Sequence, residues 1–144
     1  MSKQNIGETE ISVKNQFAVS EIYSWAEINV FHRTRNGIYQ RDEKLISLLT
    51  DFGRINPCYP DSFDEQNSDT IFYTGNGRRG DQPLNPPNRA LLAAIESEHV
   101  VPLFNKLAVG QWRFEGFWRV AVSEYLFDEQ TERMIWRFTL KRES

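Results

Sequence analysis

The segment Gly75–Gln82 has the residue types of a phosphate-binding loop. Its three glycines satisfy the pattern G-x-G-x-x-G directly after a predicted strand. A dinucleotide site also needs a helix that opens inside the motif, so that the helix N-terminus meets the pyrophosphate. Three prolines follow before residue 88, so no helix can begin early enough, and the Gly-Lys-Ser/Thr of a P-loop is missing. We therefore interpret the segment as a glycine-rich turn, on which Arg78 and Arg79 either contact phosphates or are simply solvated.

Other side chains with catalytic or metal-binding chemistry are scattered along the chain. His32 and His99 are far apart, and neither has a neighbouring ligand at metal spacing, so no metal or cofactor is predicted. The acids Asp61 and Asp64 could serve a hydrolase, although an acidic loop is more often only solvated. No nucleophile elbow is present, but a triad is a spatial arrangement that a sequence cannot exclude.

Composition indicates one folded domain without a membrane span. The chain has 144 residues, of which 40% are hydrophobic, and no apolar run approaches the ~20 residues of a spanning helix. Cys58 is the only cysteine, and the polar start of the chain has no secretory apolar region, so a cytoplasmic location is expected. The net charge of -3 argues mildly against non-specific nucleic-acid binding, although a local basic face between Arg33 and Arg54 stays open.

Capping signals predict two helices. Ser24, with Glu27 three residues later, forms a capping box for a helix over Ser24–Phe31. Asn85, followed by two prolines, predicts the start of a second helix over Asn88–Glu98. Residues 1–16 lack periodicity and are expected to be a flexible tail, which leaves residues 17–144 as the domain.

Hydrophobic alternation predicts the sheet. Short strands are expected at Leu45–Thr50, at Asp69–Thr74 and at Val100–Phe104, the last at an edge because it contains Pro102. Residues 112–122 and 134–140 alternate apolar and polar side chains, which predicts a long hairpin joined by a loop over Glu124–Glu132. Their aromatic stripe could stack bases but is more typical of a barrel core. The expected fold is α+β, a curved, mostly antiparallel, barrel-like sheet with two flanking helices.

Five short motifs follow one another between Tyr23 and Arg142. They are Tyr23-Ser-Trp-Ala-Glu-Ile28, Tyr73-Thr-Gly-Asn-Gly-Arg-Arg-Gly-Asp-Gln82, Asn88-Arg-Ala-Leu91, Phe114-Glu-Gly-Phe-Trp-Arg-Val120 and Arg137-Phe-Thr-Leu140. Their types and serial order resemble the SRA (YDG) domain family, whose core signature is Y-T-G-x-G-x-x-G-D-Q/M. The first motif is similar to the helix start of the bacterial branch often fused to HNH nucleases.

The resemblance implies a PUA-like barrel that reads modified cytosine, of the 5-methyl or 5-hydroxymethyl type, in duplex DNA by base flipping. Unstacking a base costs a few kcal/mol, which stacking and edge hydrogen bonds in a pocket must return. It implies a base pocket and a set of DNA phosphate or loop contacts. The pocket residues are Tyr59, Asp61, Asp64, Tyr73 and Thr74, with either Asp61 or Asp64 as the reader of the cytosine N4 amino group. The phosphate or loop contacts are Gly75, Gly77, Arg78, Arg79, Arg33 and Arg35, with Arg41 as a further candidate.

The resemblance also implies a non-catalytic module, so that any nuclease activity would reside in a separate domain or partner. Two alternatives remain open at this point. One is a protein-interaction domain of the same fold that does not bind DNA. The other, less favoured, is a small enzyme acting on nucleic acid through Asp61 or Asp64.

Overall fold

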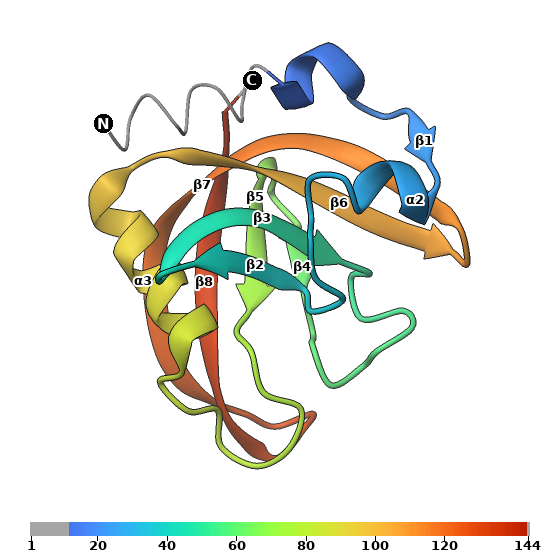
Figure 1. Cartoon of the computed structure of the whole chain (residues 1–144). Coiled ribbons are helices and arrows are strands. Elements are labelled where there is room, and N and C mark those ends of the chain that lie inside the picture. The colour runs from blue at the N-terminus through green and yellow to red at the C-terminus, as the bar shows by residue number, and fades with distance from the viewer. Residues whose placement is uncertain (1–11, 144) are drawn as a thin grey trace.

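A computed structural model describes residues 12–143 of the chain (Figure 1). Its described elements are β1 (Ile22–Tyr23), α2 (Trp25–Ile28), β2 (Ile38–Arg41), β3 (Lys44–Thr50), β4 (Ser62–Asp64), β5 (Asn67–Thr74), α3 (Pro86–Ser97), β6 (Val100–Ala108), β7 (Gln111–Asp128) and β8 (Arg133–Glu143). Residues 12–16 are also helical.

The strands form one strongly curled sheet (Figure 1). Its order is β2-β3-β6-β7-β8-β5-β4, and β1 pairs with β7 outside this path. The pairing of β3 with β6 is parallel, and the other described pairings are antiparallel. The expected curved, mostly antiparallel α+β fold is confirmed.

The core lies inside the curl and under α3. Trp118, Phe138 and Leu91 are fully buried in the larger cluster, and Phe104 and Phe114 lie in a second cluster nearer the N-terminus. Burial of each such side chain contributes about 1.5–3 kcal/mol. The aromatic stripe of β7 and β8 therefore serves mainly as core.

Both predicted helix starts are present, while the first helix is shorter than expected. Ser24 accepts a hydrogen bond from the Glu27 amide, and the Glu27 carboxylate accepts one from the Ser24 amide. The helix nevertheless ends at Ile28 instead of continuing to Phe31. Asn85 caps α3, which runs over Pro86–Ser97, and Glu98 leaves the helix in the left-handed conformation.

Two strand predictions were wrong. Strand β6 lies between β3 and β7 and is not an edge strand. Pro102 is tolerated because the pairing of β6 with β3 begins only at Leu103. In addition, the register between β6 and β7 shifts at this point. The expected loop Glu124–Glu132 is also shorter, since β7 continues to Asp128 and pairs with β8 down to Arg133.

The first described residues of the chain pack in the second core cluster. Residues 1–11, most of the expected tail, lie outside the described residues. The rest of that segment, residues 12–16, is helical, and Val13 within it is fully buried beside Phe17. In the part of the chain that the structure describes, no helix is long and apolar enough to cross a membrane.

Candidate base-binding site

The two ends of the curled sheet approach each other where β3 extends beyond the end of its partner strand, β2. The pairing between these strands reaches only Ile38 and Leu48, so the carbonyl of Leu49 is left for another donor. The Tyr73 hydroxyl, at the far end of the sheet on β5, donates to this carbonyl at 2.8 Å, and the Gly37 carbonyl lies 3.3 Å away. Side chains thus close the barrel at this point, and a cavity lies beside them.

Asp61 makes the second connection between the sheet ends. Its Oδ2 accepts a hydrogen bond from the Thr50 hydroxyl at 2.6 Å, and its Oδ1 accepts one from the Thr74 amide at 2.6 Å. Burial raises the pKa of the Asp61 carboxyl to about 7, although these hydrogen bonds oppose the shift. A carboxylate offers about four acceptor positions, so each oxygen retains capacity for a ligand.

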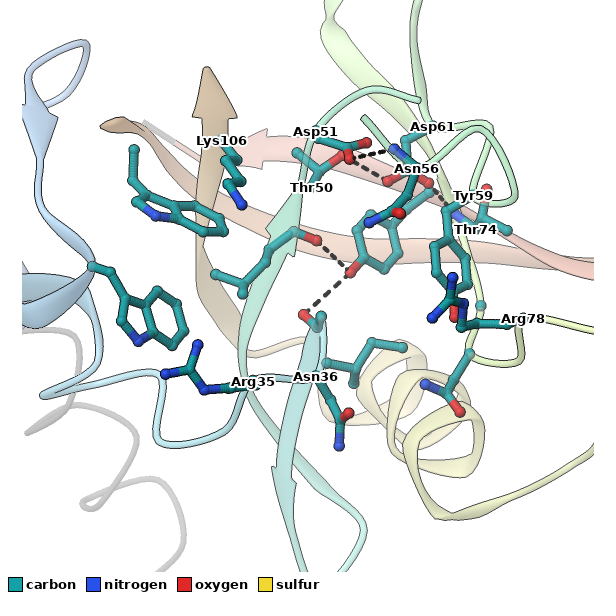
Figure 2. A pocket seen from close by; sticks show the side chains of 18 of the residues that line it. Arg35, Asn36, Thr50, Asp51, Asn56, Tyr59, Asp61, Thr74, Arg78 and Lys106 are labelled. Carbon is teal, nitrogen blue, oxygen red and sulfur yellow. Dashed lines mark hydrogen bonds between the residues drawn. The ribbon is translucent and has the colours of Figure 1, made fainter. Parts of the chain in front are cut away.

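The cavity has a volume of about 620 Å³ and crosses the ends of several strands. Figure 2 shows Tyr59, Thr74 and Arg78 on one side of it and Lys106 and Arg35 on the other. Its residues come from the strand ends and the loops between them. They are Trp25, Arg35, Asn36, Gly37, Ile38, Leu49, Thr50, Asp51, Asn56, Tyr59, Asp61, Tyr73, Thr74, Gly75, Asn76, Arg78, Lys106, Val109, Gly110 and Trp112.

Arg133 joins the two loops that carry Tyr59 and Arg78. Its guanidinium donates to the carbonyls of Gly77 at 2.5 Å and Gly80 at 3.2 Å on one loop, and to that of Cys58 at 2.6 Å on the other. The residue is only 5% exposed. The planar fork of an arginine side chain suits such divergent acceptors, so Arg133 fixes the spacing between the two loops.

Buried amides shape the glycine-rich loop. The Gln82 side chain donates to the Gly75 carbonyl and accepts from the Trp136 amide, while Asn88 bonds both the amide and the carbonyl of Asn76. A Cβ atom on Gly75 would lie 2.7 Å from the Asn88 Oδ1 and 2.8 Å from the Trp136 Cβ. Glycine is therefore required here by close packing.

A pair of indoles forms the opposite wall. The rings of Trp25 and Trp112 lie 5.4 Å apart, with Arg35 over the first at 5.8 Å and Lys106 over the second at 5.7 Å. The turn that carries Arg35 is held by His32. The buried His32 ring bonds the Ser47 hydroxyl at 2.7 Å and the Asn36 carbonyl at 2.6 Å.

Comparison with known proteins decides the family. The family model of the ScoMcrA-like SRA domain matches residues 27–141, most of the chain. The chain belongs to this SRA family. Comparison with curated proteins found no match.

Solved structures share the fold of this SRA domain. The SUVH5 SRA domain in complex with hemi-methylated CG DNA is 24% identical, with a TM-score of 0.73 over 87% of each chain. Its complex with fully hydroxymethylated CG DNA is 24% identical, with a TM-score of 0.69 over 88% of this chain and 89% of that one. The modification-dependent TagI restriction endonuclease is 18% identical, with a TM-score of 0.70 over 88% of this chain and 50% of that one.

The SRA cavity brings together most of the residues expected to form its pocket. Tyr59, Asp61, Tyr73 and Thr74 all line it, as do Gly75, Arg78 and Arg35 among the expected loop and phosphate contacts. Tyr73 is 3% exposed, and its hydroxyl donates a hydrogen bond to the Leu49 carbonyl. Its ring therefore forms a fixed floor of the cavity. Tyr59 is more accessible, and burial raises the pKa of its phenol.

The other expected residues are not among those that line the cavity. They are Asp64, Gly77, Arg79, Arg33 and Arg41. Asp64 lies at the end of β4, where its carboxylate accepts a hydrogen bond from the Gln66 amide within the turn. Gly77 supports the loop through its carbonyl. Between the two candidate acids, the geometry thus favours Asp61.

Several cavity residues were missed by the sequence analysis. Thr50, Asn36, Asn56 and Lys106 carry no local motif, and they reach the cavity only because their strands or turns end there. Trp112 belongs to the aromatic stripe that was interpreted as more typical of a barrel core than of base stacking. It is indeed 8% exposed, but its position at the start of β7 also places it on the cavity wall.

Proposed function

We propose that this SRA domain binds duplex DNA and reads a modified cytosine that is swung out of the helix into the cavity. The convergence of Tyr59, Asp61, Tyr73 and Thr74 on one concavity is the observation that supports it. Tyr59 supplies an accessible ring that can stack on the base, which is worth about 1–3 kcal/mol per base. The structural relatives whose names mention methylated or hydroxymethylated DNA support the same function.

Asp61 is the proposed reader of the cytosine edge. A carboxylate accepts from the N4 amino group of cytosine, and the bonds from Thr50 and Thr74 hold this carboxylate in one orientation. With a pKa raised to about 7, the group also exists partly as an acid near neutral pH. The acid can donate to the cytosine N3 while its other oxygen accepts from N4.

The domain is proposed to act without catalysis of its own. Among residues 12–143 there is no cluster of three or more histidine, cysteine or acidic side chains that could hold a metal ion. Any nuclease activity would then belong to a separate domain or partner, as the similarity to a modification-dependent restriction endonuclease suggests. A restriction-modification context is part of this proposal.

We expect binding to weaken steeply with salt, because Arg35 and Arg78 lie at the cavity where phosphates of the flipped nucleotide must pass. Each neutralised phosphate contributes a slope of about -0.9 in log affinity against log salt. Replacing Arg78 with alanine should reduce that slope by roughly 0.9. Arg119→Ala, which removes an arginine paired with Glu143, should leave it unchanged. Fluorescence polarisation from 50 to 200 mM salt measures both, and equal slopes in all three proteins would contradict phosphate contact by Arg78.

Asp61→Asn tests the edge reading itself. The asparagine oxygen can still accept from the Thr74 amide, and its NH2 group can donate to the Thr50 hydroxyl, but a neutral amide oxygen accepts from the cytosine N4 amino group more weakly than a carboxylate does. Affinity for a 5-methylcytosine duplex should fall by about 1–3 kcal/mol, while affinity for the unmodified duplex, held by phosphate contacts, should not change. Binding titrations with both duplexes measure the difference.

The matched control is Asp64→Asn, which changes an acid of the same region outside the cavity. It should leave the preference for the modified duplex intact. A loss in Asp64→Asn with none in Asp61→Asn would transfer the role to Asp64. No preference for any modified duplex in the unaltered protein would refute the reader function and favour a protein-interaction domain.

A further inference from the structure

The cavity is larger than a cytosine requires. The eight heavy atoms of cytosine fill at most roughly 240 Å³ if each takes the ~30 Å³ of a water molecule in the liquid. The cavity measures about 620 Å³, within the range of about 300–1,000 Å³ typical of pockets for drug-sized ligands. More than half of the space therefore remains when a base lies against Asp61.

This remaining space has its own wall, which we call the indole lobe and define by Trp25, Arg35, Lys106 and Trp112. Figure 2 places Arg35 and Lys106 on the side of the cavity opposite Tyr59 and Arg78. The lobe is built on neighbouring strand ends. Lys106 pairs with Trp112, and the two indoles stand 5.4 Å apart.

The indole lobe lines the same cavity as Asp61. Asp61 bonds Thr50, and Thr50 pairs with Asn105, the residue before Lys106. On cytosine, the 5-position is next to the carbon that carries the N4 amino group. A base whose amino group meets Asp61 can therefore send its 5-substituent along these strand ends into the lobe.

The chemistry of the lobe suits a hydroxylated substituent. Guanidinium and ammonium groups are donors only, and Arg35 and Lys106 present them beside aromatic surface. Asn36, which lines the same cavity, adds a side chain that both donates and accepts. Its hydrogen bonds to His32 and Thr34 run through its backbone. Sugar hydroxyls can bond such groups, while the apolar face of a sugar ring packs on an indole.

We propose that the indole lobe accommodates a sugar-sized, hydroxylated substituent at the 5-position, so that this domain reads glycosylated as well as methylated cytosine. The inference rests on the proposed reader function. A hexose joined through a hydroxymethyl group adds thirteen heavy atoms to the base, which fill at most roughly 390 Å³ by the same measure. The space beyond the base matches that requirement.

The test is a binding series with four duplexes that differ at one position, which carries cytosine, 5-methylcytosine, 5-hydroxymethylcytosine or glucosylated 5-hydroxymethylcytosine. We expect the glucosylated duplex to bind at least tenfold more tightly than the unmodified one and no less tightly than the methylated one. If the methylated duplex is preferred while the glucosylated one binds like unmodified DNA, the inference is overturned and the reader function stands. If no modified duplex is preferred, both fail.

A pair of variants at Lys106 locates the substituent. Lys106→Trp fills the lobe from a strand position that tolerates aromatic residues, and it should lower the ratio of glucosylated to methylated affinity at least tenfold. Lys106→Met, which removes the ammonium donor at similar length but leaves the lobe open, should lower that ratio by less than Lys106→Trp does. Equal losses for both duplexes in Lys106→Trp would place the substituent elsewhere. Arg35→Trp, on an exposed turn residue, repeats the test if Lys106→Trp does not fold.

Discussion

Replacing Arg133 with methionine is expected to destabilise the domain by about 2–4 kcal/mol. The substitution keeps an apolar stem of similar length but leaves the carbonyls of Cys58, Gly77 and Gly80 without their shared donor. Each buried polar group that loses its partner costs about 1–3 kcal/mol, and part of this is recovered where the loops relax towards water. Urea denaturation followed by tryptophan fluorescence gives the free energy of unfolding, with an unchanged slope if unfolding stays two-state.

Two further variants define what Arg133 contributes. Arg133→Lys retains the charge but not the planar fork, so its stability should fall between those of the parent and Arg133→Met. Arg79→Met removes an exposed arginine from the same glycine-rich loop and should change stability by less than about 0.5 kcal/mol. If Arg133→Met were as stable as Arg79→Met, the proposed connection between the two loops would be wrong.

Acidification should remove about 3 kcal/mol of the stability that depends on His32. Burial lowers the pKa of this imidazole from 6.5 to about 4, so between these values the unfolded chain binds a proton that the folded protein excludes. Stability therefore falls as the pH drops from about 6.5 to 4, by about 1.4 kcal/mol for each unit of pKa difference. The lowered pKa of His99, caused mainly by burial, acts in the same direction.

The titration of Asp61 changes the stability in the opposite direction, so its effect must be separated from that of His32. Its raised pKa means that the folded protein keeps a proton that the unfolded chain releases between about pH 4 and 7. Its contribution is therefore present at low pH and is lost as the pH rises through about 7. The difference in unfolding free energy between the parent and His32→Gln cancels the Asp61 effect. That difference should favour the parent at pH 8 and shift by about 3 kcal/mol towards the variant at pH 4. A difference independent of pH would show that His32 is not held neutral.

Local signals predicted most of the fold because the interactions behind them are local. The capping box at Ser24 and the N-cap at Asn85 involve partners within three residues, and alternation within β7 and β8 needs no knowledge of other strands. Local reasoning failed at Pro102, which predicted an edge strand although the pairing of β6 with β3 begins one residue later. It failed again after Val122, where charged and apolar residues of a projecting hairpin resemble a loop.

The candidate site was less accessible from sequence. Tyr59, Asp61, Tyr73 and Thr74 were grouped only through the family resemblance, since composition and spacing do not show that residue 61 meets residue 50. Thr50 and Lys106 take their positions from the parallel pairing of β3 with β6, a contact that links residues more than fifty positions apart. The choice between Asp61 and Asp64 likewise required the distances to Thr50 and Thr74.

The side chains that close the barrel at the cavity act as a latch. Between residues 12 and 143, β3 and β5 are connected there by the Tyr73 hydroxyl and the Asp61 carboxylate and not by a backbone ladder. The atoms that would hold a base are then the same atoms that hold the two sheet ends together. A ligand that draws on an Asp61 oxygen changes how firmly Thr50 and Thr74 are bound, so recognition and local rigidity depend on one carboxyl group. If Asp61 reads the base as proposed, a substitution there therefore alters the closure of the barrel together with the selectivity.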